Sequence, residues 1–357
     1  MTFLMIDIGA GTMDLLWYES ATGEHYKAVA PSPVRDVARR LAETTGSLVV
    51  TGVEMGGGPV SELLRARARS ADVVMSAAAA ATLHHDPERV RGWGIRVEDP
   101  PALGRCLADP TYTPVTLGDV QSRRITELLA GLGLPPEVDV VALCAQDHGV
   151  APEGTSHLDF RQSQFRSRLD ENPSPRALLF RGDEVPASFN RLRSIAQTAA
   201  ELRPAEVYVL DSGMAAILGA TQDVQLAGKR AAIVLDIATS HTVAAVVAEG
   251  DLAGYFEYHT RDVTLERLET LLPALADGRI DHATLLAEGG HGAYLRRAVG
   301  FDRIETILAT GPKRRLVAGS SFPITWGAPW GDNMMTGTVG LLEAVRRRKG
   351  LAPIQYL

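Results

Sequence analysis

The stretch M-I-D-I-G-A-G-T-M-D-L-L at residues 5–16 decides the fold. An apolar run leads to Asp7, a small turn follows at residues 9–12, and a second apolar run begins directly after it. Glycines at a sharp turn let backbone N–H groups face an anion, which is typical of phosphate binding. A Rossmann loop would open a helix, but Leu15–Tyr18 has the composition of a strand, so dinucleotide binding is disfavoured. An ordinary glycine hairpin is the alternative interpretation.

The same pattern returns in I-V-L-D-I-A-T-S-H-T-V-A-A-V-V at residues 233–247. It again gives a strand that ends at Asp236, a small polar turn and a second strand. Two copies of one hairpin predict two similar domains that face each other across a nucleotide cleft. Short apolar runs also alternate with helical patterns along the chain, which indicates an α/β protein.

Composition limits the possible classes of function. The 357 residues carry a net charge of −7, which does not favour nucleic-acid binding. The chain starts in an apolar strand without a basic leader, and no apolar run reaches about 18 residues, so we expect a cytoplasmic protein with no membrane partner. The two cysteines, Cys106 and Cys144, are too few for a disulfide framework.

Five segments in chain order resemble the superfamily of acetate and sugar kinases, heat-shock chaperone ATPases and actin. They are residues 5–14, 210–219, 234–243, 307–315 and 332–343. The resemblance implies two ribonuclease H-like (actin-like ATPase) domains, with ATP and Mg²⁺ between them. We expect the first domain at residues 1–219, with long excursions at 86–119 and 149–186, and the second at 220–357. Residues 210–219 and 332–343 would be connecting helices, whose small residues at Gly219, Gly337 and Gly340 let them cross closely.

Within that superfamily the chain resembles a branch labelled as similar to pyruvate formate-lyase activating enzyme. A radical activator of that type needs three cysteines spaced Cys-X-X-X-Cys-X-X-Cys to hold a 4Fe–4S cluster, and this chain has two cysteines in all. Reductive activators of the same superfamily share a cluster between two subunits, but Cys106 lacks their glycine-rich Cys-Ala-Ala-Gly-Thr-Gly context. We therefore set this activity aside and expect no iron–sulfur cluster.

The nucleotide site is expected at the two hairpins and near the adenosine segment. The first phosphate loop supplies Asp7, Gly9, Ala10, Gly11 and Thr12. The second supplies Asp236, Thr239, Ser240, His241 and Thr242. The nucleotide edge of the cleft would be lined by Glu288, Gly289, Gly290, Gly311, Lys313 and Arg314. Asp7, Asp14 and Asp236 suit Mg²⁺ or its bound water.

Two departures from the superfamily pattern keep a third interpretation open. Ala238 stands where relatives usually have glycine, and alanine is costly at positive φ. Pro312 removes an N–H that would face the nucleotide. His241 is also unusual, and it either contacts phosphate or simply hydrogen-bonds the loop backbone.

The sequence A-Q-D-H-G at residues 145–149 resembles the Gly-Gln-X-His-Gly loop that faces the substrate in sugar kinases. By this resemblance Asp147 would accept a hydroxyl proton and His148 would orient a phosphate or substrate oxygen. The alternative is that Asp147 caps a neighbouring turn.

Three hypotheses follow. The first is an ATPase or small-molecule kinase, and the second is an ATP-dependent switch that acts on a partner protein. The third is a degenerate scaffold without nucleotide.

Overall fold

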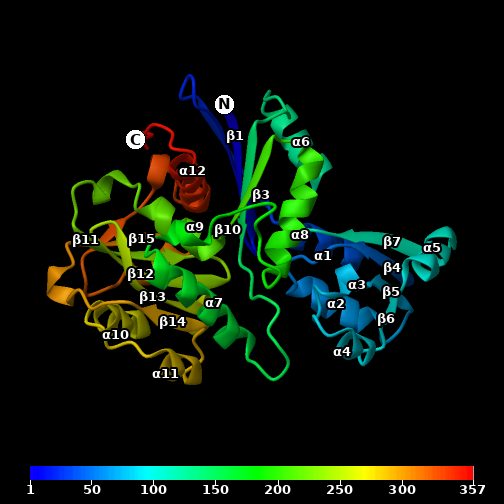
Figure 1. The fold of residues 1–357 in the computed structure, drawn as a ribbon. Helices are drawn as coiled ribbons and strands as arrows, with labels where there is room; N and C mark the ends of the chain where they lie inside the picture. Colours follow the sequence, from blue (N-terminus) through cyan, green and yellow to red (C-terminus); the bar gives the residue numbers. More distant parts are fainter. Residues whose placement is uncertain (357) are drawn as a thin grey trace.

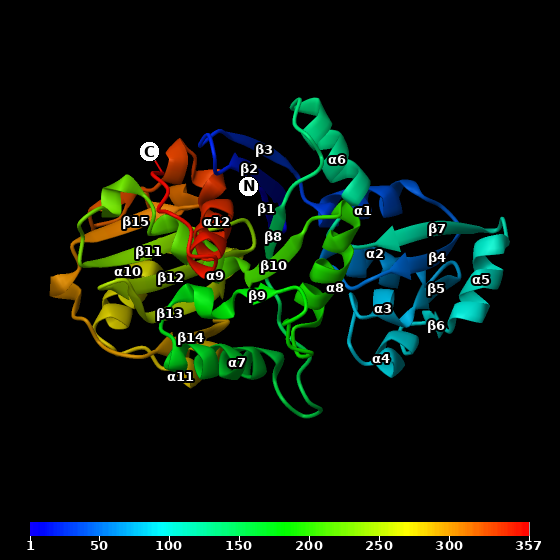
Figure 2. The ribbon, with the colours of Figure 1, turned by 45° about the horizontal axis from the view of Figure 1, so that its top comes forward.

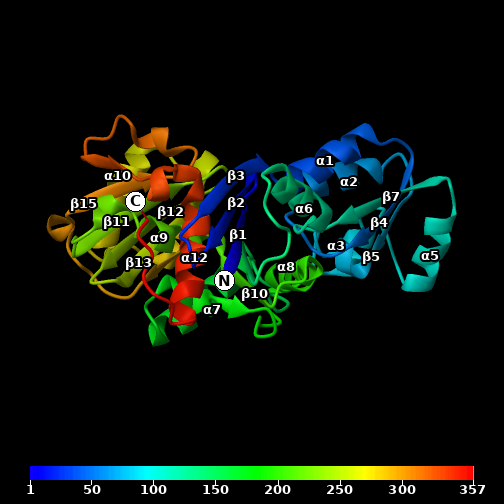
Figure 3. The ribbon, with the colours of Figure 1, turned by 90° about the horizontal axis from the view of Figure 1, so that it is seen from above.

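The structure, a computed structural model, describes residues 1–356 and contains three β-sheets. The sheets follow one another in a row, with the N-terminal sheet in the middle (Figure 1, and from above in Figure 3). The expected α/β class is confirmed.

The first sheet has six strands in the order β3-β2-β1-β8-β10-β9. Its strands are β1 (Thr2–Ile8), β2 (Thr12–Glu19), β3 (His25–Pro31), β8 (Val140–Ala145), β9 (Phe180–Arg181) and β10 (Glu206–Asp211). β1, β2 and β3 form an antiparallel meander, while β8 and β10 extend the sheet parallel to β1. Every residue of β8 is buried, because helices cover both faces of the sheet there.

The second sheet repeats this plan in the order β14-β13-β12-β11-β15-β16. Its strands are β11 (Ala231–Ile237), β12 (His241–Ala248), β13 (Asp251–His259), β14 (Gly292–Leu295), β15 (Thr306–Thr310) and β16 (Ile324–Trp326). β11 to β13 form the antiparallel meander, and β15 and β16 continue parallel to β11. Two sheets of this ribonuclease H-like topology are the two halves of an actin-like ATPase fold, as the repeated hairpin predicts.

The third sheet is a finding that the sequence did not suggest. It is fully parallel in the order β6-β5-β4-β7, with β4 (Ser47–Gly52), β5 (Val73–Ser76), β6 (Arg96–Glu98) and β7 (Tyr112–Leu117). The expected excursion at 86–119 contains two strands and two helices of that sheet. The whole unit lies between β3 and β8 in the chain and forms the lobe on the right in Figure 2.

Twelve α-helices are present in the described residues. Those of the third sheet are α1 (Pro33–Glu43), α2 (Pro59–Arg67), α3 (Ala77–Ala80), α4 (Pro87–Arg91) and α5 (Pro100–Ala108). The others are α6 (Ser122–Gly131), α7 (His157–Glu171), α8 (Asn190–Ala199), α9 (Ser212–Ala220), α10 (Leu265–Ala276), α11 (His282–Ala287) and α12 (Thr336–Arg348). None of these helices has the length and apolar character needed to cross a membrane.

The predicted close crossing of the two connecting helices is confirmed for α9 and α12. A Cβ atom on Gly219 would lie 1.8 Å from the carbonyl oxygen of Thr336, and one on Gly340 would lie 1.9 Å from that of Ala215. Only glycine permits this approach, and the crossing joins the two large sheets because α9 contacts strands of both.

The second expected excursion, residues 149–186, also contains regular secondary structure. It contains the 15-residue helix α7, which packs beside β14 of the second sheet. Its buried members include Arg161 and Gln162, so its face toward the protein is partly polar and lacks the apolar periodicity of an ordinary surface helix.

Candidate functional site

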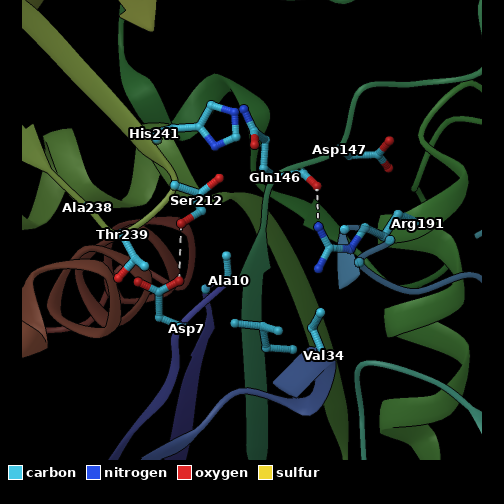
Figure 4. A pocket seen from close by; sticks show the side chains of 18 of the residues that line it. Asp7, Ala10, Val34, Gln146, Asp147, Arg191, Ser212, Ala238, Thr239 and His241 are labelled. Atoms are coloured by element: carbon cyan, nitrogen blue, oxygen red, sulfur yellow. Dashed lines mark hydrogen bonds between the residues drawn. The ribbon is translucent and has the colours of Figure 1, made fainter. Parts of the chain in front are cut away.

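A cavity of about 600 Å³ lies where the three sheets meet. Its walls come from the tips of the two predicted hairpins, from the start of α12, from the loop after β8, and from the third sheet's glycine-rich turn at residues 56–58. Figure 4 shows the first hairpin below, His241 above and Arg191 to the side. The structure thus brings both predicted phosphate loops to one cavity.

The two hairpin tips are equivalent in backbone geometry. The N–H of Gly9 donates to the carbonyl of Thr12 at 3.0 Å, and the N–H of Ala238 donates to that of His241 at 3.1 Å. Among non-glycine residues described, positive φ is confined to three positions elsewhere, so Ala238 adopts its turn without that cost.

The two glycines of the first tip are not required by a left-handed backbone conformation. Neither Gly9 nor Gly11 has a positive φ. A Cβ on Gly11 would lie 2.9 Å from Oγ1 of Thr239, so the two tips touch here and a larger residue would have to displace the Thr239 side chain. Thr239 therefore occupies the gap between the two loops.

Three aspartates gather beneath the tips. Asp7 and Asp14 are cross-strand partners in β1 and β2, and Asp236 is the next-to-last residue of the equivalent strand β11. Burial raises the pKa of Asp14 to about 8 and that of Asp236 to about 7, and the charge of Asp7 adds to both shifts. Oδ1 of Asp14 is buried without a hydrogen-bond partner. Neighbouring carboxylates with one orphaned oxygen suit a hard divalent cation such as Mg²⁺ or its bound water.

Hydrogen bonds hold the Asp7 carboxylate in place among these three aspartates. Cys144 and Ser212 both donate hydrogen bonds to its Oδ1 at 3.1 Å, and Figure 4 marks the second of these. A Cβ on Gly337 would lie 2.0 Å from Asp7 Oδ2, so glycine lets the first turn of α12 approach this carboxylate. A helix N-terminus beside a carboxylate or phosphate is a favourable arrangement.

Asp147 lies in the cavity wall, but both of its carboxylate oxygens are occupied. Oδ1 accepts from the N–H of Gly149 at 2.8 Å and Oδ2 accepts from the N–H of Leu192 in α8 at 2.9 Å. Burial raises its pKa to about 6. In Figure 4 its side chain turns away from Asp7. These contacts are those of a turn cap, while the general-base role remains a prediction.

The remaining predicted residues divide into two groups. His148 and Gly311 line the cavity together with Ala10, Thr12, Thr239, Ser240 and His241. Outside its lining are Thr242, Glu288, Gly289, Gly290, Lys313 and Arg314. Thr242 is fully buried against Thr260, Glu288 pairs with Arg267, and Arg314 donates to the carbonyl of Gly327 at 2.5 Å. A nucleotide role for these outer residues stays a prediction.

Several cavity residues were missed by the sequence analysis. On the third-sheet side, Nε2 of His85 lies 3.0 Å from Oε1 of Glu54, and this contact raises the pKa of His85. Arg191 of α8 pairs with Asp119 at 2.8 Å and donates to the carbonyl of Gln146 at 2.8 Å. Nothing in the local sequence marks these residues, because their partners lie far away in the chain.

Arg161 of α7 is neither solvent-exposed nor part of the cavity lining. It is 2% exposed and pairs with Asp211 at 2.9 Å and with Glu257 at 2.6 Å. This buried cluster connects α7 with both large sheets. Through its ion pair with Glu257, the Arg161 guanidinium lies next to the cavity wall, which contains Glu257.

The described residues hold no disulfide, since Cys106 and Cys144 are both free and buried. Cys144 lies in β8 of the first sheet and Cys106 in α5 of the third-sheet unit. The absence of an iron–sulfur cluster remains a prediction.

Solved structures resemble this chain over nearly its full length at low identity. One is the ethanolamine utilization protein EutJ from Carboxydothermus hydrogenoformans (11% identity, 96% of this chain and 89% of that chain, TM-score 0.37). Another is the activator of the 2-hydroxyisocaproyl-CoA dehydratase from Clostridium difficile with bound ADPNP (8% identity, 99% of both chains, TM-score 0.35). A third is the ROK hexokinase from Thermus thermophilus (14% identity, 98% of this chain and 100% of that chain, TM-score 0.30). No curated protein matches the sequence.

One family model also matches. It covers residues 55–316, well over half of the chain, and includes the second phosphate hairpin and most of the third-sheet unit. The predicted branch of the superfamily is thereby confirmed. The protein belongs to the family described as "Putative pyruvate format-lyase activating enzyme (DUF1786)".

Proposed function

We propose that this protein binds Mg·ATP between its two hairpin tips and hydrolyses it or transfers its γ-phosphate to a small molecule. The observation that carries the proposal is the convergence of Asp7, Asp14 and Asp236 in one cavity, with pKa values raised by burial and by repulsion from neighbouring aspartates. A divalent cation relieves that repulsion. The backbone of residues 9–12 and 238–241, with the first turn of α12, would hold the phosphates.

The far side of the cavity supports an acceptor site. It is lined there by polar groups of the third-sheet unit and of α8, including Glu54, His85 and Arg191. Such groups bind hydroxyl, carboxylate or phosphate groups of a small molecule. A radical activating reaction is not proposed, because two cysteines cannot provide the three thiolates of its cluster motif.

Besides Pro312, which lines the cavity, the scaffold alternative rests on the contact between Gly11 and Thr239. With the tips touching, a phosphate requires them to separate or the Thr239 side chain to rotate. Thr239→Ala therefore distinguishes the hypotheses, because it opens the gap without touching the carboxylates. We expect this variant to bind nucleotide at least as tightly as the unchanged protein.

The test is a thermal unfolding assay with ATP and ADP, with and without Mg²⁺. Ligand at 100 times its dissociation constant stabilises a fold by about 2.7 kcal/mol. Asp7→Asn should abolish the Mg²⁺-dependent shift, whereas Asp302→Asn, an exposed aspartate outside the cavity lining, should keep it. If neither the unchanged protein nor Thr239→Ala responds to any nucleotide at millimolar concentration, the proposal fails and the scaffold hypothesis stands.

Turnover then separates the two active hypotheses. ATP consumption that requires one metabolite would identify a kinase. Slow basal hydrolysis that is stimulated by a protein, and by no metabolite, would identify the partner-dependent switch.

A further inference from the structure

Three imidazoles from separate parts of the second sheet meet at one edge of it. His241 begins β12 and His259 ends β13, and the two are direct cross-strand partners. His291 precedes β14, and its N–H donates to the carbonyl of Glu257 at 2.8 Å. One nitrogen from each ring can be chosen so that all three lie within 4.8 Å of one another. The backbone pairing of three strands therefore fixes this cluster.

Two nitrogens of the cluster have no hydrogen-bond partner. Nε2 of His241 and Nδ1 of His291 are buried and unpaired in the part of the chain that the structure describes. Buried polar side-chain atoms are normally satisfied, so an orphaned pair in one cluster points to a missing partner. Packing of the rings alone, with centroids 4.0 to 4.8 Å apart, leaves these nitrogens unexplained.

A transition metal is the partner that matches this donor set. Imidazole nitrogen suits zinc and its neighbours, whereas Mg²⁺ prefers oxygen. Tetrahedral zinc with Zn–N bonds of about 2.0–2.1 Å places its nitrogens roughly 3.3 Å apart, which small rotations of the three side chains would achieve. Strands hold the ligands here, so the site is largely preformed.

We propose that His241, His259 and His291 bind one divalent transition-metal ion of the zinc class. Three histidines leave a fourth position open, as in catalytic zinc sites. That position would face the cavity, because His241 and His259 line it and the ring of His148 lies 6.2 Å from those of His241 and His291. This histidine site is chemically distinct from the group of Asp7, Asp14 and Asp236, and it does not depend on the proposed nucleotide function.

The test uses the full chain, stripped of metal with a chelator and titrated with Zn²⁺ in excess Mg²⁺. We expect one equivalent of Zn²⁺ per chain, and Co²⁺ in its place should give the visible absorption of a tetrahedral or five-coordinate nitrogen site. His259→Gln and His291→Gln should each weaken zinc binding by more than about 100-fold, since loss of a residue that only hydrogen-bonds a metal ligand already costs about 10–100-fold. His25→Gln should leave binding unchanged, because His25 lies in β3 and stacks on Trp330.

Two further measurements keep the proposal testable if a variant folds poorly. Asp7→Asn should retain the zinc equivalent even if it loses nucleotide, which separates this site from the proposed function. Anomalous diffraction at the zinc edge from the unchanged protein should place a peak among the three imidazoles. The absence of bound zinc in the unchanged protein would overturn the proposal. So would loss of zinc in a variant that carries both His84→Gln and His157→Gln, since these two histidines also line the cavity, with ring centroids 6.3 Å apart, and the ion would then lie beside them.

Discussion

At the scale of single residues, Asp147 has two candidate roles, turn cap and general base, which experiment can separate. Its oxygens accept the N–H groups of Gly149 and Leu192, so we expect Asp147→Asn to lower the free energy of unfolding by about 1 kcal/mol. Denaturant unfolding at pH 8 measures this loss. ATP turnover should stay within a few-fold of the unchanged protein.

The sugar-kinase resemblance makes the opposite prediction for the same variant. Loss of a general base lowers turnover by about 10²–10⁴-fold. If Asp147→Asn shows that loss with unchanged stability and nucleotide affinity, Asp147 is catalytic and the cap is secondary.

The pair of His85 and Glu54 predicts a pH dependence of stability. The carboxylate of Glu54, helped by the nearby charge of Asp147, raises the pKa of His85, so the folded chain binds this proton more tightly than the unfolded chain. The stabilisation is therefore complete below the unfolded pKa of about 6.5 and is lost as the pH rises through the folded pKa.

His85→Gln tests this, because glutamine still donates to Glu54 but does not titrate. Relative to this variant, the unchanged protein should be more stable by on the order of 1 kcal/mol at pH 6 than at pH 9, as measured by urea unfolding. An equal difference at both pH values would show that folding leaves the pKa of His85 unchanged, and a smaller one at pH 6 would show that folding lowers it.

At the scale of elements, the close crossing of α9 and α12 depends on glycines, which have no side chain. Gly219→Ala would place a methyl group 1.8 Å from a backbone oxygen, so we expect a loss of about 3 kcal/mol in the free energy of unfolding. Gly104→Ala in α5 is the matched control, since a Cβ there meets nothing within 4 Å. It should be neutral or stabilising by about 0.5–1 kcal/mol. Similar effects of both substitutions in thermal unfolding would contradict the close crossing.

At the scale of the whole molecule, the third-sheet unit has the properties of an inserted domain. Two hydrophobic clusters lie entirely within residues 34–117. Its two ends are adjacent, because Gln121 donates to Asp36 at 3.2 Å and Arg124 donates to the carbonyl of Pro31 at 2.7 Å. We expect a fragment of residues 33–120 to fold alone and to unfold in one cooperative transition by circular dichroism. A fragment without such a transition would mean that this lobe needs the rest of the chain.

The sequence by itself determined the parts of the protein that repeat locally. Apolar runs ending at Asp7 and Asp236, each followed by a small turn and a second run, were enough to predict both hairpins and the two related sheets. Small residues at Gly219 and Gly340 were enough to predict the close helix crossing. In these cases a contiguous stretch carries both the strand or helix pattern and the residue whose size or charge matters.

Only the tertiary structure decided which residues far apart in the chain come into contact. The parallel third sheet, the burial of Arg161 between Asp211 and Glu257, and the meeting of His241, His259 and His291 all depend on strand order and register. The contact between Gly11 and Thr239 likewise depends on how the two halves face each other. Side chains far apart in the chain carry no local pattern, because their proximity arises from long-range pairing and packing that no single stretch of sequence encodes.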